Sequence, residues 1–381
     1  MERIYLDHAA TTPLHPAVIE TIAEQMAGAY GNPSSIHSFG RESRHILDTA
    51  RTTAAKSIGA DFNEIIFTSG GTEADNLAII GTARAMKHRG RHIITSAVEH
   101  HAVLHTCAYL EKEGYEVTYL PVDEAGVISL SDFASSLRED TILVSIMYGN
   151  NEVGAIQPIA EIGELLKEHP AVFHTDAVQA YGMVSIDVNS QHIDLLSVSS
   201  HKINGPKGIG FLYVKDGLAL TPGLFGGEQE RKRRAGTENV PAIAGFGKAI
   251  EIAMESMKEK REQYTGFKKQ LVHLLTEKGV GFAVNGSLEQ TLPHVVNLSF
   301  PGTDVESMLV NLDLAGIAVS SGSACTAGSI EPSHVLVAMF GKDSERLRNS
   351  IRFSFGLTNA KEQIDEAGEA VAKIVARLTS Q

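Results

Sequence analysis

The sequence predicts an α/β protein whose main domain is built on a mostly parallel sheet. Three observations favour this class: strand-length apolar runs alternate with helix-period segments, polar and glycine-rich loops follow the runs, and the chain has 381 residues. Strands separated by helices are typical of βαβ units, in which helices cover both faces of a sheet. Because single hydrophobic cores stop growing at roughly 250–300 residues, the length also predicts two domains.

Seven apolar runs of strand length are expected to form the main sheet. In order, they are Glu64–Thr68, His92–Thr95, Glu116–Leu120, Thr141–Met147, Ala171–His174, Ile193–Val198 and Gly210–Val214. Segments of helical period lie between some of them, at Asn76–Met86, Val103–Glu113 and Ile159–Lys167. Ligands of such sheets bind beyond the carboxyl ends of the strands, so the loops that follow the strands are expected to carry the chemistry.

The last third of the chain predicts a second, smaller α/β domain. A long, charged segment of helical period, Pro241–Lys278, is expected to connect the two domains. The segments expected to build the smaller domain are Val295–Phe300, Glu306–Leu312, Ile317–Ser320, Ile351–Phe355 and a closing helix at Ala360–Leu378. We therefore expect a large domain over residues 14–255 and a small domain made of residues 1–13 and 256–381.

Composition and charge argue against several classes of protein. The 33 basic and 46 acidic residues give a net charge of −13, which is unlike a dedicated nucleic-acid-binding protein. No stretch approaches the ~20 apolar residues of a membrane span, and the first residues carry charge where a signal peptide is apolar. We expect a cytoplasmic protein that contacts neither a membrane nor, directly, a nucleic acid.

The two cysteines of the chain lie in different settings and give no disulfide framework. Cys325 stands in a run of small residues, Ser320–Ser329, which has no apolar face to bury. A mobile surface loop over about residues 320–331 is therefore predicted, and its thiol is either a reactive group or an incidental residue of a linker. Cys107 lies at an apolar spacing in a predicted helix and is expected to be part of the core.

Two glycines, Gly70 and Gly71, stand between a predicted strand and a predicted helix. Backbone N–H groups can approach a ligand closely there, and the helix N-terminus adds partial positive charge, so a phosphate would fit. Thr72 followed by Asp75 is also typical of a helix cap, which needs no ligand. The spacing of a nucleotide P-loop is absent.

Two other strand ends carry a charged residue. Lys202 follows an apolar strand beside hydroxyl and imidazole groups, and a desolvated lysine can lose its proton and form a Schiff base with an aldehyde cofactor. Asp176 ends another apolar run, where an acid can pair with the protonated pyridine nitrogen of pyridoxal phosphate. Each has a plain alternative, because Lys202 can extend to solvent and Asp176 can cap a helix. The order of phosphate turn, acid and lysine favours the cofactor.

Histidines and arginines supply further candidates. His101 and His105 stand four apart on a predicted helix, as metal ligands do, but no nearby carboxylate or second thiol completes a ligand set, so no metal is expected. His100 is better placed to stack on a planar cofactor. Arg352 is the cation of an alternating strand pattern and offers a fork for a carboxylate, unless it is a salt-bridged surface arginine. The run Arg231–Arg234 could contact RNA but is typical of a solvated face.

Together these motifs, from Tyr5–Thr12 to Arg352, resemble the cysteine desulfurases, which are pyridoxal-phosphate enzymes of the class V aminotransferases with fold type I. The resemblance covers essentially the whole chain. It implies that Lys202 forms the Schiff base, that Asp176 pairs with the pyridine nitrogen and that His100 stacks on the ring. The other implied cofactor contacts are Asn151 and Gln179 near the phenolic oxygen, Gly71, Thr72, Ser200 and His201 at the phosphate, and Ser199, with Thr237 reaching in to the phosphate from the other subunit of a homodimer.

The resemblance also implies a substrate and a nucleophile. Arg352, helped by Asn151, would hold the carboxylate of L-cysteine, and His100 would carry a proton for the thiol. Cys325 would receive the sulfur as a persulfide, with L-alanine as the other product, and pass it to an acceptor such as an iron–sulfur scaffold or a tRNA thiouridylase. One departure is visible, because Lys232, Arg233 and Ala235 replace the smaller or hydroxyl residues usual beside the intersubunit phosphate contact.

Two other functions stay open from the sequence. A selenocysteine lyase or an aminotransferase on the same fold would share the lysine and the acid, but a transaminase would not need Cys325. A non-catalytic sulfur-relay or tRNA-binding scaffold is suggested by Arg231–Arg234, and the net charge of −13 disfavours it.

Overall fold

The computed structural model describes residues 3–321, 325–326, 329–330 and 332–380, and its centre is a seven-stranded sheet. The strand order is β2 (Ile65–Thr68), β8 (Gly210–Val214), β7 (Leu195–Ser199), β6 (Val172–Asp176), β5 (Thr141–Ser145), β3 (His92–Ser96) and β4 (Glu116–Leu120). Only β8 among these runs antiparallel to its neighbours, β2 and β7. The predicted sheet of seven mainly parallel strands is therefore confirmed.

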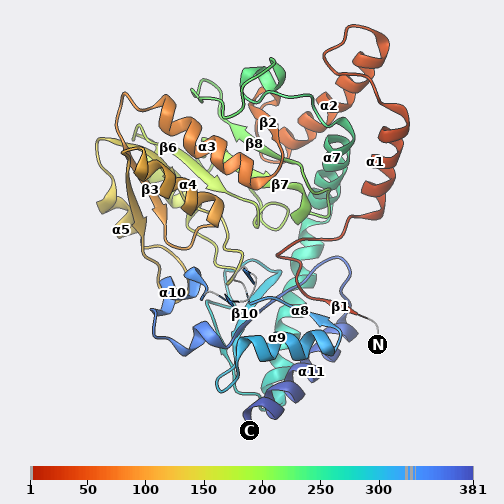
Figure 1. Ribbon diagram of the computed structural model, residues 1–381, viewed down its shortest axis with the longest axis vertical. Coiled ribbons are helices and arrows are strands. Elements are labelled where there is room, and N and C mark those ends of the chain that lie inside the picture. The colour runs from red at the N-terminus through yellow and green to blue at the C-terminus, as the bar shows by residue number, and fades with distance from the viewer. Residues whose placement is uncertain (1–2, 322–324, 327–328, 331, 381) are drawn as a thin grey trace.

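Both faces of this sheet are buried except at the edge strand β4, as the continuous apolar runs predicted. Alternate residues of one strand face opposite cores, so that Phe211 and Tyr213 of β8 belong to one apolar cluster and Leu212 to another. The helices that pack around the sheet are α1 (Pro16–Gly28), α2 (Ser38–Lys56), α3 (Gly71–Ala85), α4 (His101–Lys112), α5 (Leu130–Ser136), α6 (Ile159–Leu166) and α7 (Val240–Glu255) (Figure 1). No helix within the described ranges is both long and apolar enough to span a bilayer.

The C-terminal third forms a smaller layer below this sheet (Figure 1). Its three-stranded antiparallel sheet has the order β14 (Ser350–Ser354), β10 (Val295–Ser299), β9 (Ala283–Val284). The helices beside it are α8 (Met257–Glu277), α9 (Val305–Leu314), α10 (His334–Phe340) and α11 (Lys361–Thr379). The N-terminal strand β1 (Ile4–Tyr5) pairs in parallel with β11 (Ile317–Ala318), so the first residues of the chain lie with its last third.

Two segments differ from a simple interpretation of the sequence. The helical segment Pro241–Lys278 is two helices rather than one, because α7 ends at Glu255 and α8 begins at Met257. Ser256 breaks the period with φ −97° and ψ 4°, and its N–H donates to the carbonyl of Ile252. In the Cys325 region, β12 (Cys325–Thr326) pairs with β13 (Ser329–Ile330). The predicted mobility of this loop, and the side chain of Cys325, lie outside the described part of the structure.

Candidate active site

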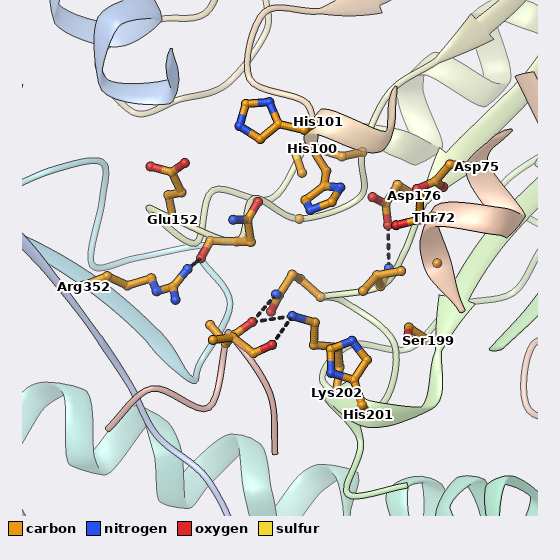
Figure 2. A pocket seen from close by; sticks show the side chains of 18 of the residues that line it. Thr72, Asp75, His100, His101, Glu152, Asp176, Ser199, His201, Lys202 and Arg352 are labelled. Atoms are coloured by element: carbon orange, nitrogen blue, oxygen red, sulfur yellow. Dashed lines mark hydrogen bonds between the residues drawn. The ribbon is translucent and has the colours of Figure 1, made fainter. Parts of the chain in front are cut away.

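A cavity of about 460 Å³ lies at the carboxyl edge of the main sheet, where the small layer and the N-terminal segment meet it (Figure 2). This size is in the range of small-ligand pockets. Loops after five sheet strands contribute to its wall, as the position of ligands in such sheets predicts. The predicted site residues that line it are Gly71, Thr72, His100, Asn151, Asp176, Gln179, Ser199, His201, Lys202 and Arg352.

The glycine turn after β2 opens helix α3 directly. The helix begins at Gly71, and its N-cap is Gly70 with φ 149°, so the cap that Thr72 and Asp75 suggested is wrong. A Cβ atom on Gly71 would lie 2.8 Å from a methyl group of Val178, which leaves no room for a side chain. The first backbone N–H groups of α3 therefore face the cavity without a capping side chain, which is the arrangement that holds a phosphate.

Lys202 turns its amine into this cavity (Figure 2). Its Nζ donates to the carbonyl oxygens of Ala9 at 2.6 Å and Ala10 at 2.9 Å. Burial, with a smaller contribution from the charge of Arg352, lowers the pKa of Lys202 to about 8. A lysine extended into bulk solvent would keep its ordinary pKa, so this alternative does not fit.

Asp176 and His100 face the cavity from the ends of neighbouring strands. Asp176 is the last residue of β6, and its Oδ1 accepts a hydrogen bond from the N–H of Val178 at 2.9 Å; no helix starts there for it to cap. Burial raises the pKa of Asp176, because a buried carboxylate loses its hydration, so a cationic partner at its free oxygen would stabilise it. His100 is the N-cap of α4, and its Nδ1 accepts from the N–H of Ala102 at 3.1 Å.

Arg352 is buried rather than exposed. Its guanidinium forms an ion pair with Asp7 at 2.8 Å and donates to the carbonyl oxygen of Asn151 at 3.0 Å, while its Nε has no partner. The interpretation as a surface salt bridge is therefore wrong, although the salt bridge itself exists. A cation held at the cavity wall by one carboxylate and one carbonyl can receive the carboxylate of a small ligand.

Two positioning residues were missed by the sequence analysis. Asp7 lies 345 residues from Arg352, and only the small-residue cluster that follows it could have indicated its position. The Nε2 atom of His294 lies 3.1 Å from Oε1 of Gln179. Burial lowers the pKa of His294 to about 3, so its ring is neutral and donates a hydrogen bond to this oxygen. The amide of Gln179 then donates to the carbonyl of Ala9 at 2.9 Å, next to the amine of Lys202.

Two of the predicted residues whose side chains the structure describes do not line the cavity. Ser200 is fully buried behind it, and its hydroxyl has no hydrogen-bond partner. Thr237 is exposed and is not among the residues that line the cavity of its own chain. The side chain of Cys325 lies outside the described residues.

The remaining candidates from the sequence are the thiol of Cys107 and the pair His101 and His105. Cys107 is fully buried, and burial raises its pKa to about 12, so it is not a nucleophile at neutral pH. The rings of His101 and His105 stack with centroids 5.0 Å apart. No group of three or more possible metal ligands occurs among the residues that the structure describes.

One cavity of this α/β fold brings together an amine of lowered pKa, a buried acid and a glycine turn. These features define an enzyme that uses an aldehyde cofactor. A family model described as aminotransferase class-V matches residues 4–366, and the chain belongs to this family.

Similar proteins extend this assignment over the whole chain. A candidate cysteine desulfurase, IscS 1, from Bacillus subtilis (strain 168) is 63% identical over 379 residues, with 100% of each chain covered. A cysteine desulfurase IscS from Methanosarcina thermophila is 50% identical, covering 98% of this chain and 92% of its own. A solved NifS-like protein has a TM-score of 0.92 at 36% identity, covering 98% and 100% of the two chains. The structure of SspA in complex with cysteine has a TM-score of 0.81 at 37% identity, covering 92% and 98%.

The cavity fits pyridoxal phosphate, the cofactor of this family. Its glycine turn is closed to side chains, its lysine amine has a lowered pKa, and its buried acid accepts a backbone hydrogen bond from Val178. These three features match, respectively, a phosphate, an aldehyde and a protonated ring nitrogen.

Proposed function

We propose that this protein is a pyridoxal-phosphate-dependent cysteine desulfurase that converts L-cysteine to L-alanine and leaves the sulfur as a persulfide on Cys325. The observation that carries the proposal is the convergence of Lys202, Asp176 and Arg352 on one cavity. The names of the similar proteins support the choice of desulfurase over aminotransferase.

We propose the following contacts for the cofactor. Lys202 would bind its aldehyde carbon, Asp176 its ring nitrogen, and His100 the face of its ring. Asn151 and Gln179 would hold the phenolic-oxygen side, Gly71, Thr72, Ser200 and His201 the phosphate, and Ser199 would be a further cofactor contact. When bound, the cofactor supplies an electron sink for the electron pair left when a proton is removed from the substrate Cα.

The substrate would be oriented by its carboxylate. Arg352 binds this group, because its guanidinium lies at the cavity wall and is held there by Asp7. The Nζ of Lys202 removes the Cα proton and can return one to the substrate carbon chain, since its lowered pKa leaves a large neutral fraction near pH 8. The Nδ1 of His100 accepts from Ala102, which leaves Nε2 to exchange a proton with the substrate thiol.

The sulfur transfer balances without an added oxidant. The Cys325 thiolate attacks the substrate sulfur, an S–S bond forms as the C–S bond breaks, and the carbon takes a proton to become the methyl group of alanine. The thiol of Cys325 thus becomes a persulfide, and one sulfur atom has moved from substrate to enzyme. Cys107 does not compete, because its thiol is buried and its pKa is raised to about 12.

We also propose that the protein works as a homodimer. Large apolar side chains of the α1–α2 region are exposed, among them Met26 at 71%, Tyr30 at 75% and Ile36 at 91%. The rings of Tyr30 and Phe39 in this region have centroids 5.3 Å apart, and exposed apolar groups that gather in this way are typical of a protein–protein interface. Thr237 is exposed on its own chain, which is compatible with a contact to the phosphate in the partner's cavity.

The finer assignments of partner and location rest on the same proposal. We propose a cytoplasmic enzyme that passes its sulfur to an acceptor protein, either an iron–sulfur scaffold or a tRNA thiouridylase. No direct nucleic-acid contact is proposed, since the net charge is −13.

The cofactor assignment is tested by replacing the lysine. Lys202→Ala should abolish the yellow absorbance of the purified protein and its release of alanine from cysteine. Lys207→Ala, which removes an exposed lysine five residues further along, is the matched control and should keep both. An unchanged absorbance spectrum in Lys202→Ala would contradict the proposal.

A further inference from the structure

Residues 228–237, called the strap here, run beside the glycine turn in an unusual backbone conformation. Three successive residues, Glu230, Arg231 and Lys232, have φ values of 45°, 56° and 67°. Residues with a side chain disfavour this left-handed region by about 1–2 kcal/mol each. Such a run persists only when contacts elsewhere fix it, so the contacts of the strap indicate what it is built to hold.

The first contact ties the strap to strand β2. Both carboxylate oxygens of Glu230 accept from the guanidinium of Arg51, at 2.7 and 2.8 Å, and one also accepts from the N–H of Phe67 at 3.1 Å. The two charged side chains are only 5% and 3% exposed. Because breaking a buried ion pair leaves a charge uncompensated, this contact fixes the strap firmly to the strand that leads into the glycine turn.

The second contact lies on the other side of the turn, in the first turn of α3. The guanidinium of Arg234 binds Glu73 through two hydrogen bonds, of 2.8 and 3.2 Å. Glu73 also accepts from the N–H of Ser69 at 2.7 Å, across the two glycines. Arg234 therefore fixes the Glu73 carboxylate, which closes the turn. Further along the strap, the N–H of Gly236 donates to Oε1 of Gln229 at 3.1 Å.

Arg234 offsets the negative charge of Glu73, which would otherwise repel a phosphate at the N-terminus of α3. Glu73 belongs to the first turn of α3, whose N-terminus is the proposed phosphate position, and it directly follows Thr72, which lines the cavity. Two anions close together repel each other, and the helix N-terminus alone offsets this only in part. Burial by itself raises the pKa of Glu73, but the hydrogen bonds from Arg234 and Ser69 together outweigh it and lower the pKa, so the carboxylate stays charged and depends on the arginine for its neutralisation.

We propose that Arg234 is a positioning residue for the phosphate site: it neutralises Glu73 and holds the Ser69–Thr72 turn in the form that accepts a phosphate dianion. This inference rests on the proposed function, because it takes the phosphate to be that of pyridoxal phosphate. Arg234 does not touch the phosphate in this account and acts through Glu73.

The test compares two ligands of the cofactor-free protein, pyridoxal phosphate and pyridoxal, which lacks the phosphate. Arg234→Gln should weaken the binding of pyridoxal phosphate about tenfold or more and leave pyridoxal within about twofold. Adding Glu73→Gln to that variant should restore most of the lost affinity, since the charge that needed neutralising is gone. Arg138→Gln, which removes an exposed ion pair with Asp140, is the control and should change neither ligand.

Three results would overturn the inference: equal affinity of wild type and Arg234→Gln for pyridoxal phosphate, an equal loss for both ligands, or no rescue by Glu73→Gln. If Arg234→Gln does not fold, the single variants Arg234→Lys and Glu73→Gln still test the inference. Both should keep pyridoxal phosphate affinity within about fivefold, and a larger loss in either contradicts the account. A wild-type protein that binds neither ligand contradicts the proposed function instead.

Discussion

The amine of Lys202 should react with an aldehyde at a pH where ordinary lysines are still protonated. Burial is the main cause of its lowered pKa of about 8, and the charge of Arg352 adds to it, while Asp176 and Asp7 act in the opposite direction. Two perturbations test this origin: the pH of the cofactor-free protein, and the variant Arg352→Gln, which removes the neighbouring positive charge.

The magnitude follows from the two pKa values. With a pKa of about 8, about half of the Lys202 amines are neutral at pH 8. An ordinary lysine with a pKa of about 10.5 has about 0.3% of its amines neutral at that pH. Lys202 should therefore react about 150-fold faster at pH 8 than an unperturbed lysine in the same geometry, and its rate should level off above about pH 9.

The assay is the rate at which cofactor-free protein captures pyridoxal phosphate, followed by the change in absorbance between pH 6 and 11. The wild type should show a midpoint near pH 8, and Arg352→Gln should move it upward, because a neighbouring cation favours the neutral amine. Lys202→Ala should show no capture and serves as the blank. A wild-type rate that still rises above pH 10, or a midpoint that moves downward in Arg352→Gln, would refute this reasoning.

Two further predictions concern the strained strap and the buried thiol. Lys232→Gly should raise the free energy of unfolding by about 0.5–1 kcal/mol, because glycine adopts a φ of 67° without strain and the ion pair that is lost, with Glu228, is exposed. Glu230→Gly, in the same backbone region, should instead lower the free energy of unfolding by about 3–5 kcal/mol, because the buried ion pair with Arg51 is lost. Urea denaturation of the two variants measures both changes. Native protein should react with iodoacetamide at Cys325 but not at Cys107, whose pKa is about 12, until it is unfolded; rapid alkylation of Cys107 in the native state, detected by mass spectrometry, would contradict its burial.

The main sheet was predictable because its signal is local. Each buried strand is a short apolar run, and a strand such as Val172–Asp176 ends at the charged residue that the sequence singled out. The boundary of the two predicted domains at residues 255 and 256 stays a prediction, although the helix break at Ser256 falls there. The break itself was missed, because the apolar period continues through it.

The supports of the site were not predictable, because they join distant parts of the chain. The ion pair between Arg352 and Asp7 spans 345 residues, and the hydrogen bond from Lys202 to Ala9 spans 193. The bond between His294 and Gln179 likewise joins residues 115 positions apart, from the loop before β10 and the loop after β6, and follows no local pattern. A single sequence indicates which side chains carry chemistry, whereas the residues that orient them follow from the tertiary fold.

The central claim is that Cys325 receives the substrate sulfur, and the mass of the protein after a single turnover with L-cysteine tests it most directly. One added sulfur atom is expected on the peptide that contains Cys325, with one alanine released per sulfur bound and no added sulfur on the peptide of Cys107. Cys325→Ser should keep the yellow absorbance of the cofactor and gain no sulfur. If Cys325→Ser releases alanine from cysteine at the wild-type rate, the nucleophile is another group and the account is wrong.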